Sequence, residues 1–368
     1  MAGLTASRYA LLALGGIGLL AGLTGALVLL GVPMPAPARS LGADHGVLMT
    51  LGFLGTLISL ERAVALGRGW GYLAPLLAGA GGLTLIADGP PMFALTLFAA
   101  GATVFVAMYV AFDRIERSIH TSVQAVGALA WLGAAILLLG GRSPREVVPW
   151  LAAFLVLTIA GERLELSRLV QLTSRARIGF VAAAAIFCLG VAMSAATADT
   201  GMRVAGIGLV ALAAWLARND VARRTMRMNG TPRFVALSLL SGYAWLAVAG
   251  ACWLIFGATV GGPAYDAMLH AVFLGFVMSM VFGHAPIILP AVLGTPLPYR
   301  PRFYAHLVLL HLGLLLRIVA GDLLGSEVAW QAGGILNVTA LLLFVASSAL
   351  AIAAERRAIP RVAPAPSP

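Results

Sequence analysis

Residues 269–290 of this chain read LHAVFLGFVMSMVFGHAPIILP. This stretch contains no aspartate, glutamate, lysine or arginine, and it is long enough to cross about 30 Å of hydrocarbon as a helix. Two histidines, His270 and His284, interrupt it. An imidazole within a membrane is costly unless a partner satisfies it, so ionisable groups in such segments usually indicate function. The stretch therefore predicts a membrane-spanning helix that carries a site.

Apolar runs of this kind recur along the whole chain. Of the 368 residues, 61% are hydrophobic and only 10% are charged, a composition that excludes an ordinary soluble domain. We predict an all-α polytopic membrane protein in a lipid bilayer, with twelve transmembrane helices. They are expected near residues 9–32, 41–66, 70–87, 90–112, 120–140, 146–170, 176–196, 201–217, 233–257, 265–290, 302–320 and 329–354.

The basic residues predict the orientation. All 24 are arginine, and a chain threaded with its N-terminus inside has most of them at one face. By the positive-inside rule, both termini are expected in the cytoplasm, and the location is expected to be the bacterial inner (cytoplasmic) membrane. The net charge of +10 is then a topology signal, and no nucleic-acid partner is expected. The opposite face receives only Arg39, Arg142, Arg145 and Arg203.

An internal repeat organises the helices. The segments GFLGTLISLERAVALGR (52–68), AFLVLTIAGERLELSRL (153–169) and GFVMSMVFGHAPIILPA (275–291) align without gaps and place Glu61, Glu162 and His284 in one column. The repeating unit is four helices and occurs three times. An even number of spans per unit makes the copies parallel. The predicted repeats are 1–117, 118–228 and 229–358, followed by a tail, 359–368, that is expected to be disordered.

His270 and His284 share one helix face at two depths. Fourteen residues are nearly four whole turns and about 21 Å of helix, so the two histidines cannot bind one metal. At the outer level, His270 is expected to face His45, because both lie near the outer ends of equivalent helices and precede a Gly-Phe pair. Two neutral imidazoles that face each other are suitable axial ligands for haem iron.

The inner level offers a second set of candidate ligands. His284 is expected to face the start of FYAHLVLLHLGLLLR (303–317), where either His306 or His311 could join it. Two histidines with an open position suit copper or a second haem. Glu61 and Glu162 are candidate proton carriers, although an interfacial ion pair with the following arginine explains each of them equally well.

These residues resemble known families. Twelve helices in three parallel four-helix units are the plan of the haem-copper oxidase catalytic subunit. DHGVLMTLGF (44–53) and LHAVFLGFVMSMVFGH (269–284) are more similar to the NnrS family, whose members contain haem and copper and are associated with resistance to nitric oxide. His45 matches the first histidine of the early family motif, and His270 and His284 match the late pair. Val47 stands where the family has a second early histidine.

The resemblance implies a haem b, a possible copper, a small diatomic ligand such as nitric oxide, and an electron donor that the sequence does not identify. Two other functions are compatible with the residues. In a proton-coupled transition-metal permease, the histidines would bind a metal in transit. In an assembly factor for a respiratory complex, they would only bond neighbouring helices. The sequence identifies no catalytic residue.

Overall fold

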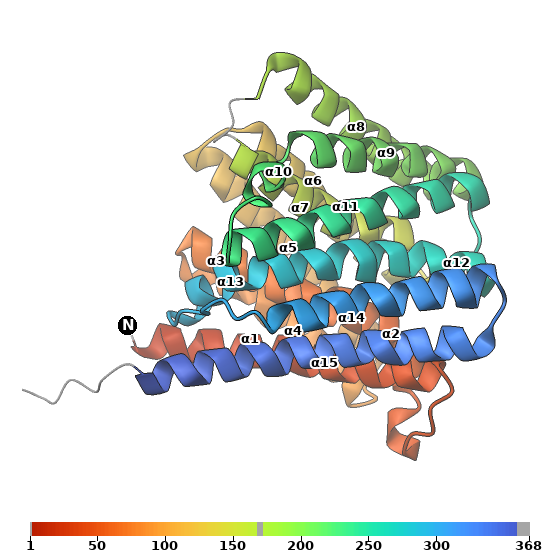
Figure 1. Cartoon of the computed structure of the whole chain (residues 1–368), viewed down its shortest axis with the longest axis horizontal. Helices are drawn as coiled ribbons and strands as arrows, with labels where there is room; N and C mark the ends of the chain where they lie inside the picture. Colours follow the sequence, from red (N-terminus) through yellow and green to blue (C-terminus); the bar gives the residue numbers. More distant parts are fainter. Residues whose placement is uncertain (1, 168–171, 359–368) are drawn as a thin grey trace, which may run out of the picture.

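The computed structural model describes residues 2–167 and 172–358, and within these ranges it contains helices and no strand. Figure 1 shows the helices side by side, with their long axes running in roughly one direction. Among the described residues, eleven helices are long and apolar enough to cross a membrane, which confirms a polytopic α-helical membrane protein. The predicted tail, 359–368, and the end of the predicted 146–170 span lie outside the described residues.

Each predicted span coincides with a helix or with consecutive helical segments. The elements are α1 (Ala2–Leu29), η1 (Ala36–Ala38), α2 (Leu41–Val47), η2 (Leu48–Gly55), α3 (Thr56–Leu66), η3 (Gly69–Tyr72), α4 (Leu73–Ile86), α5 (Pro91–Ile115), α6 (Ile119–Leu139), α7 (Val148–Leu166), α8 (Ser174–Ser194), α9 (Ala198–Asn219), α10 (Ala222–Thr225), α11 (Thr231–Phe256), α12 (Gly262–His270), η5 (Ala271–Met278), α13 (Ser279–Leu293), α14 (Phe303–Leu315), η6 (Leu316–Leu323) and α15 (Glu327–Ala358).

The helix ends follow from local chemistry. Within hydrocarbon a segment must satisfy its own backbone groups, so apolar runs become continuous helices. Pro91 and Pro149 stand in the first turns of α5 and α7, where the missing N–H costs nothing. Gly67 and Gly294 end α3 and α13 with φ of 66° and 64°, a left-handed conformation that glycine adopts without strain.

α7 differs from the eleven apolar helices. It is 19 residues long, and its C-terminal end carries three charged side chains, Glu162, Arg163 and Glu165. α6, α8, α9 and η5 all contact it, so most of its residues are buried, and Arg163 is only 3% exposed. A charged group buried at this depth must be paired, and its partners define one part of the site.

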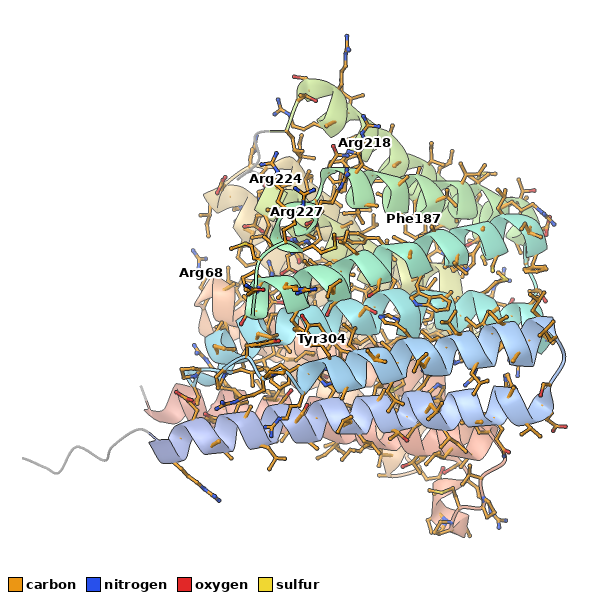
Figure 2. All side chains as sticks on the ribbon, viewed as in Figure 1. Arg68, Phe187, Arg218, Arg224, Arg227 and Tyr304 are labelled. Carbon is orange, nitrogen blue, oxygen red and sulfur yellow. The ribbon has the colours of Figure 1, made fainter. Side chains whose placement is uncertain are left out.

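Both described chain ends lie at one face of the bundle. Arg356, near the end of α15, donates a hydrogen bond to the hydroxyl of Tyr9 in α1 and lies over its ring at 5.2 Å. Figure 2 shows Arg68, Arg224 and Arg227 toward the same end. We call this the inner face, and the opposite one the outer face. Two ends at one face require an even number of crossings.

The helices that carry His45, Glu61, Glu162, His270 and His284 lie at the centre, whereas α14, which carries His306 and His311, is less buried. α5 packs against α6, α9 against α11, and α15 against α1, so the last helix of each predicted repeat contacts the first helix of the next. Inside this arrangement, α3 contacts α13 and α7 contacts η5. The segments 36–66 and 262–293 are accordingly the most buried of the eleven candidate spans.

Small residues bring α8 and α9 together. A Cβ on Gly190 would lie 2.1 Å from the backbone nitrogen of Ala205, and one on Gly201 would lie 2.3 Å from that of Ser194. Such close backbone approach is the usual means of helix association in lipid, where burial of apolar side chains gives no advantage over lipid tails.

Candidate functional site

A cluster of ionisable side chains lies between the central helices near the inner face. We call it the inner cluster: Glu61, Glu162, Arg163, Asp220 and His284. The imidazole Nε2 of His284 lies 3.9 Å from Oε1 of Glu162, and Glu61 is within electrostatic range of both. The three positions that align in the sequence repeat therefore meet in space, one from each predicted repeat.

The strongest contacts of the inner cluster join Arg163 to Asp220. Nε and Nη2 of Arg163 donate to the two carboxylate oxygens of Asp220 at 2.8 and 2.9 Å. Their side chains are only 3% and 1% exposed. Tyr243 donates its hydroxyl to the same carboxylate at 2.7 Å, and the backbone N–H of Ala222 donates at 2.8 Å. Four donors thus compensate one buried carboxylate.

The environment sets the ionisation of Asp220, which follows the last residue of α9. Burial by itself would raise the pKa of this carboxyl, but the hydrogen bonds and the positive charge of Arg163, with the bonds from Tyr243 and Ala222, outweigh it and lower the pKa below its ordinary value. Asp220 therefore remains an anion at neutral pH, and the pair ties α7 to the segment between α9 and α10.

Glu61 makes a different local contact. It accepts a hydrogen bond from Arg62, the next residue in α3, and Arg62 is in electrostatic contact with Tyr109 of α5. The alternative of an ion pair between neighbours is observed for Glu61 and Arg62. For Glu162 no such pair forms with Arg163, which turns to Asp220 instead.

His284 is held on both sides of its ring. Its Nδ1 bonds the carbonyl of Met280 at 2.7 Å, one turn earlier in α13, and its Nε2 accepts from Nη1 of Arg163 at 3.3 Å. These contacts fit a neutral imidazole protonated at Nδ1. A guanidinium beside the lone pair of Nε2 repels a metal cation at that position.

His306 and His311 do not join His284. His306 packs against Phe282 of α13 with ring centroids 4.7 Å apart, and residues two apart on a helix point in nearly opposite directions. It therefore lies on the other side of α13 from His284. The Nδ1 of His311 accepts from the indole N–H of Trp245 at 3.0 Å, which places its proton on Nε2.

The outer cluster contains the other predicted pair. It consists of His45, Asp266, His270, Arg317 and Asp322. Nδ1 of His45 bonds the carbonyl of Gly22 in α1 at 2.7 Å, and Nδ1 of His270 bonds the carbonyl of Asp266 at 2.9 Å. His45 lies within electrostatic range of His270, Asp266 and Arg317. The predicted pair is thus brought within electrostatic range, on two spans that contact each other through α3 and α13.

Asp266 is the acceptor that organises this cluster. Arg317 donates to both of its carboxylate oxygens at 2.7 Å and lies over the ring of Trp330 at 4.9 Å. One carboxylate oxygen of Asp266 also lies 3.3 Å from Nδ1 of His270. A ligand histidine typically gives its other N–H to a carbonyl or carboxylate, and His270 has both.

Three π-helical segments surround the outer cluster. η2 begins three residues after His45, η5 begins directly after His270, and η6 contains Arg317 and Asp322. π-helical turns are rare and are frequent at functional sites, because the extra residue per turn redirects side chains and frees backbone carbonyls. Both Gly-Phe pairs, at 52–53 and 275–276, lie within such a segment.

Within residues 2–167 and 172–358, no three histidine, cysteine, aspartate or glutamate side chains are placed to hold one metal ion. What the outer cluster offers is two imidazoles with Nδ1 engaged and Nε2 left as the acceptor nitrogen. The inner cluster offers carboxylates and an imidazole that can exchange protons.

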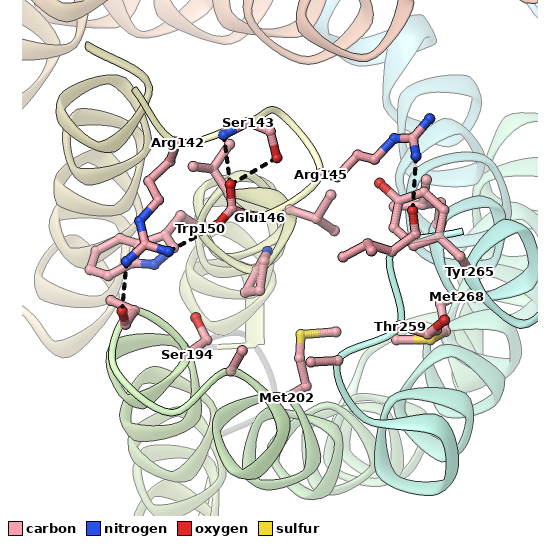
Figure 3. A pocket seen from close by; sticks show the side chains of 18 of the residues that line it. Arg142, Ser143, Arg145, Glu146, Trp150, Ser194, Met202, Thr259, Tyr265 and Met268 are labelled. Carbon is pink, nitrogen blue, oxygen red and sulfur yellow. Dashed lines mark hydrogen bonds and ion pairs between the residues drawn. The ribbon is translucent and has the colours of Figure 1, made fainter. Parts of the chain in front are cut away.

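A cavity of about 430 Å³ opens between the loop after α6, the start of α9 and α12, and no residue of the outer cluster lines it (Figure 3). Tyr265, Met268 and Leu269 of α12 form one wall, so the cavity lies against the helix that carries Asp266 and His270. Trp150 and Met202 form the facing walls, and Arg145 donates to the carbonyl of Val260 at its edge at 3.2 Å.

The sequence from residue 8 to residue 354 matches a protein family described as Domain of unknown function (DUF8744). The match covers nearly the whole chain, including every residue of both clusters. The chain belongs to this family. No curated protein matches the sequence.

Sequence reasoning missed the partners that complete both clusters. Asp220 and Tyr243 lie far along the chain from Arg163. Asp266 was missed because an aspartate near the start of a helix usually has only a local role there. Arg317 gave a signal, because it is an arginine within an apolar run. A buried arginine requires an acidic partner. Asp266, at the start of the preceding membrane span, is such a residue.

Proposed function

We propose that the protein is an integral membrane haem protein in which His45 and His270 ligate the iron. One observation carries the proposal: the two imidazoles lie within electrostatic range of each other, and both Nδ1 atoms are engaged by backbone carbonyls. That arrangement fixes the tautomer and turns Nε2 toward a ligand position.

Haem iron held by both histidines would supply one-electron transfer. A small diatomic molecule, of which nitric oxide is the one implied by the NnrS resemblance, would need a metal with an open position, which stays a prediction. The chain would orient both imidazoles, place the Asp266–Arg317 pair beside His270, and keep water away through the apolar helices around them. Burial and neighbouring charges of this kind set a haem potential. Copper and an electron donor stay predictions.

Protons would be handled at the inner cluster. Glu162 and His284 lie 3.9 Å apart, and Arg163, held by Asp220, contributes a fixed positive charge beside them. At this separation the carboxyl and the imidazole are not hydrogen-bonded, so a proton would pass between them through one bridging water. We assign Glu61 and Glu162 to proton uptake from the inner face.

The membrane arrangement is part of the same proposal. Twelve crossings, with α7 as the sixth, would leave both described chain ends at one face. Three parallel four-helix repeats would account for the contacts of α5 with α6, α9 with α11 and α15 with α1. The arginine-rich inner face would be cytoplasmic, in the inner membrane of a bacterium.

The test is the absorption spectrum and iron content of the purified full chain, produced in cells supplied with a haem precursor. We expect a Soret band and close to one iron per chain. His45→Ala and His270→Ala should lose both, whereas His311→Ala, a matched histidine on a neighbouring helix, should keep them. For variants that fold poorly, His270→Gly with added imidazole should restore the band. Protein without haem or iron would refute the proposal.

A proton-coupled transition-metal permease is the second candidate, and the inner cluster favours it. Carriers often bind protons on carboxylates buried between helices. In proteoliposomes with an internal pH dye, this function predicts proton movement driven by a Zn²⁺ or Cu²⁺ gradient and its loss in Glu162→Gln, with no haem spectrum. A haem protein without metal-driven proton movement would exclude it.

A further inference from the structure

A large apolar cavity, lined by no residue of either cluster, lies at the seam between the first and last helices. Its volume is about 690 Å³, within the range of roughly 300–1,000 Å³ that buries a whole ligand. α1 and α15 form its sides, and α3 and α13 form its floor. Because α1 and α15 lie at the periphery (Figure 1), this seam faces the lipid.

The walls of the cavity are apolar through most of its depth. Phe53 and Leu57 contribute from the second span, Val281 and Ile288 from the tenth, and Phe344 from the last. Gly16 of α1 also lines it, and a Cβ at Gly16 would meet no atom within 4 Å. The space beside this glycine is therefore open and suits a hydrocarbon chain.

The inner end of the cavity is positively charged. Arg356 and Arg357 both line it there, and both are exposed. Arg356 is held in place, since it donates to Tyr9 and to the hydroxyl of Thr295 at 3.4 Å. An apolar cavity with two arginines at the depth of the headgroups matches an amphiphile with an anionic head.

We propose that this cavity binds one anionic phospholipid of the leaflet at the inner face. An acyl chain would lie along the apolar walls between α1 and α15, and the phosphate would lie against Arg356 and Arg357. The bound lipid would join the N-terminal and C-terminal helices, which are the two ends of the predicted ring of repeats. This site is independent of the proposed haem.

The test titrates the full chain in detergent micelles with dioleoylphosphatidylglycerol and, separately, with dioleoylphosphatidylcholine, and counts bound lipid by native mass spectrometry. We expect one phosphatidylglycerol to bind more tightly than phosphatidylcholine. Arg357→Gln should weaken phosphatidylglycerol binding about fivefold, as expected from the contribution of one arginine near an anionic headgroup. Arg114→Gln, which removes an exposed arginine elsewhere at the inner face, should leave it unchanged.

Gly16→Phe tests the apolar part, because its ring would occupy the cavity. It should abolish binding, whereas Leu20→Phe, on an exposed lipid-facing position of the same helix, should not. Inorganic phosphate at millimolar concentration should not displace the lipid. Equal binding of the two lipids, unchanged binding in Gly16→Phe, an equal loss in Arg114→Gln, or displacement by phosphate would each overturn the proposal.

Discussion

Asp220→Asn is the most informative perturbation of the inner cluster. The substitution keeps the shape of the side chain but removes the charge that compensates Arg163, which is 3% exposed. Removing one partner of a buried ion pair costs about 3–5 kcal/mol, because the other charge stays buried without compensation. We therefore expect the free energy of unfolding to fall by about 3–5 kcal/mol.

Asp199→Asn is the matched control. Asp199 also pairs with an arginine, Arg203, at 2.8 Å, but the two side chains are 60% and 43% exposed. A pair in contact with water contributes about 0–1 kcal/mol. The assay is equilibrium unfolding of the full chain in mixed micelles with increasing sodium dodecyl sulfate, followed by fluorescence of its seven tryptophans.

A double-mutant cycle isolates the pair. Arg163→Met should also cost about 3–5 kcal/mol, but Arg163→Met with Asp220→Asn removes both charges, so the double variant should be more stable than the sum of the single effects predicts by several kcal/mol. Additive effects, to within about 0.5 kcal/mol, or a cost for Asp220→Asn no larger than for Asp199→Asn, would refute a strong buried pair.

The pH dependence follows from the lowered pKa of Asp220. A carboxyl whose pKa is lower in the folded state contributes stability that is fully present above its ordinary pKa of about 3.9 and is lost as the pH falls through the lowered value. The stability difference between wild type and Asp220→Asn should be constant from pH 8 to 5 and shrink only below about pH 4. A difference that already shrinks between pH 7 and 5 would contradict this assignment.

Three further predictions concern other parts of the fold. Gly190→Ala should destabilise the protein by about 1–3 kcal/mol or more, as overpacking does, because its Cβ would lie 2.1 Å from the backbone nitrogen of Ala205. Gly16→Ala is the control and should not destabilise it, because a Cβ there meets no atom within 4 Å. Equal unfolding curves for the two variants would contradict the close approach of α8 and α9. Trp131→Ala, at 0% exposure, should cost about 3–5 kcal/mol; a cost below about 1 kcal/mol would exclude a packed indole there. Glu146, whose pKa is lowered to about 2 by hydrogen bonds from a backbone N–H and two side chains of its own loop, should titrate near pH 2 in carbon-13 NMR of labelled glutamate, and a midpoint near 4.5 would show that the loop bonds do not persist.

The long apolar runs of the sequence predicted the positions of the helices. A segment such as 41–66 is apolar throughout and must satisfy its own backbone groups in hydrocarbon, so its bounds were close to those of α2, η2 and α3. The π-helical turns within it were not predicted. They depend on one extra residue per turn, which composition and hydropathy do not register.

The repeat alignment predicted part of the site. It placed Glu61, Glu162 and His284 in one column, and these side chains meet between the central helices. It did not predict that His306 and His311 would face away, because their directions depend on how α14 packs against α11, α13 and α15. A few tens of degrees of helix rotation decide which neighbour an imidazole reaches.

That this chain is a bundle of membrane helices follows from its sequence alone, since each segment in hydrocarbon must satisfy its own backbone hydrogen-bonding groups. The sequence also indicated some of the ionisable residues that are buried, such as His284 and Arg317, because they stand within apolar runs. Asp220, which is equally buried, stands in a charged segment and gave no such signal. The partners of the buried groups are seen only in the folded protein: Arg163 pairs with Asp220, Arg317 pairs with Asp266, and His45 bonds the carbonyl of Gly22. The physical reason is that a buried charge requires compensation, but the group that supplies it is selected by the packing of helices distant in the sequence.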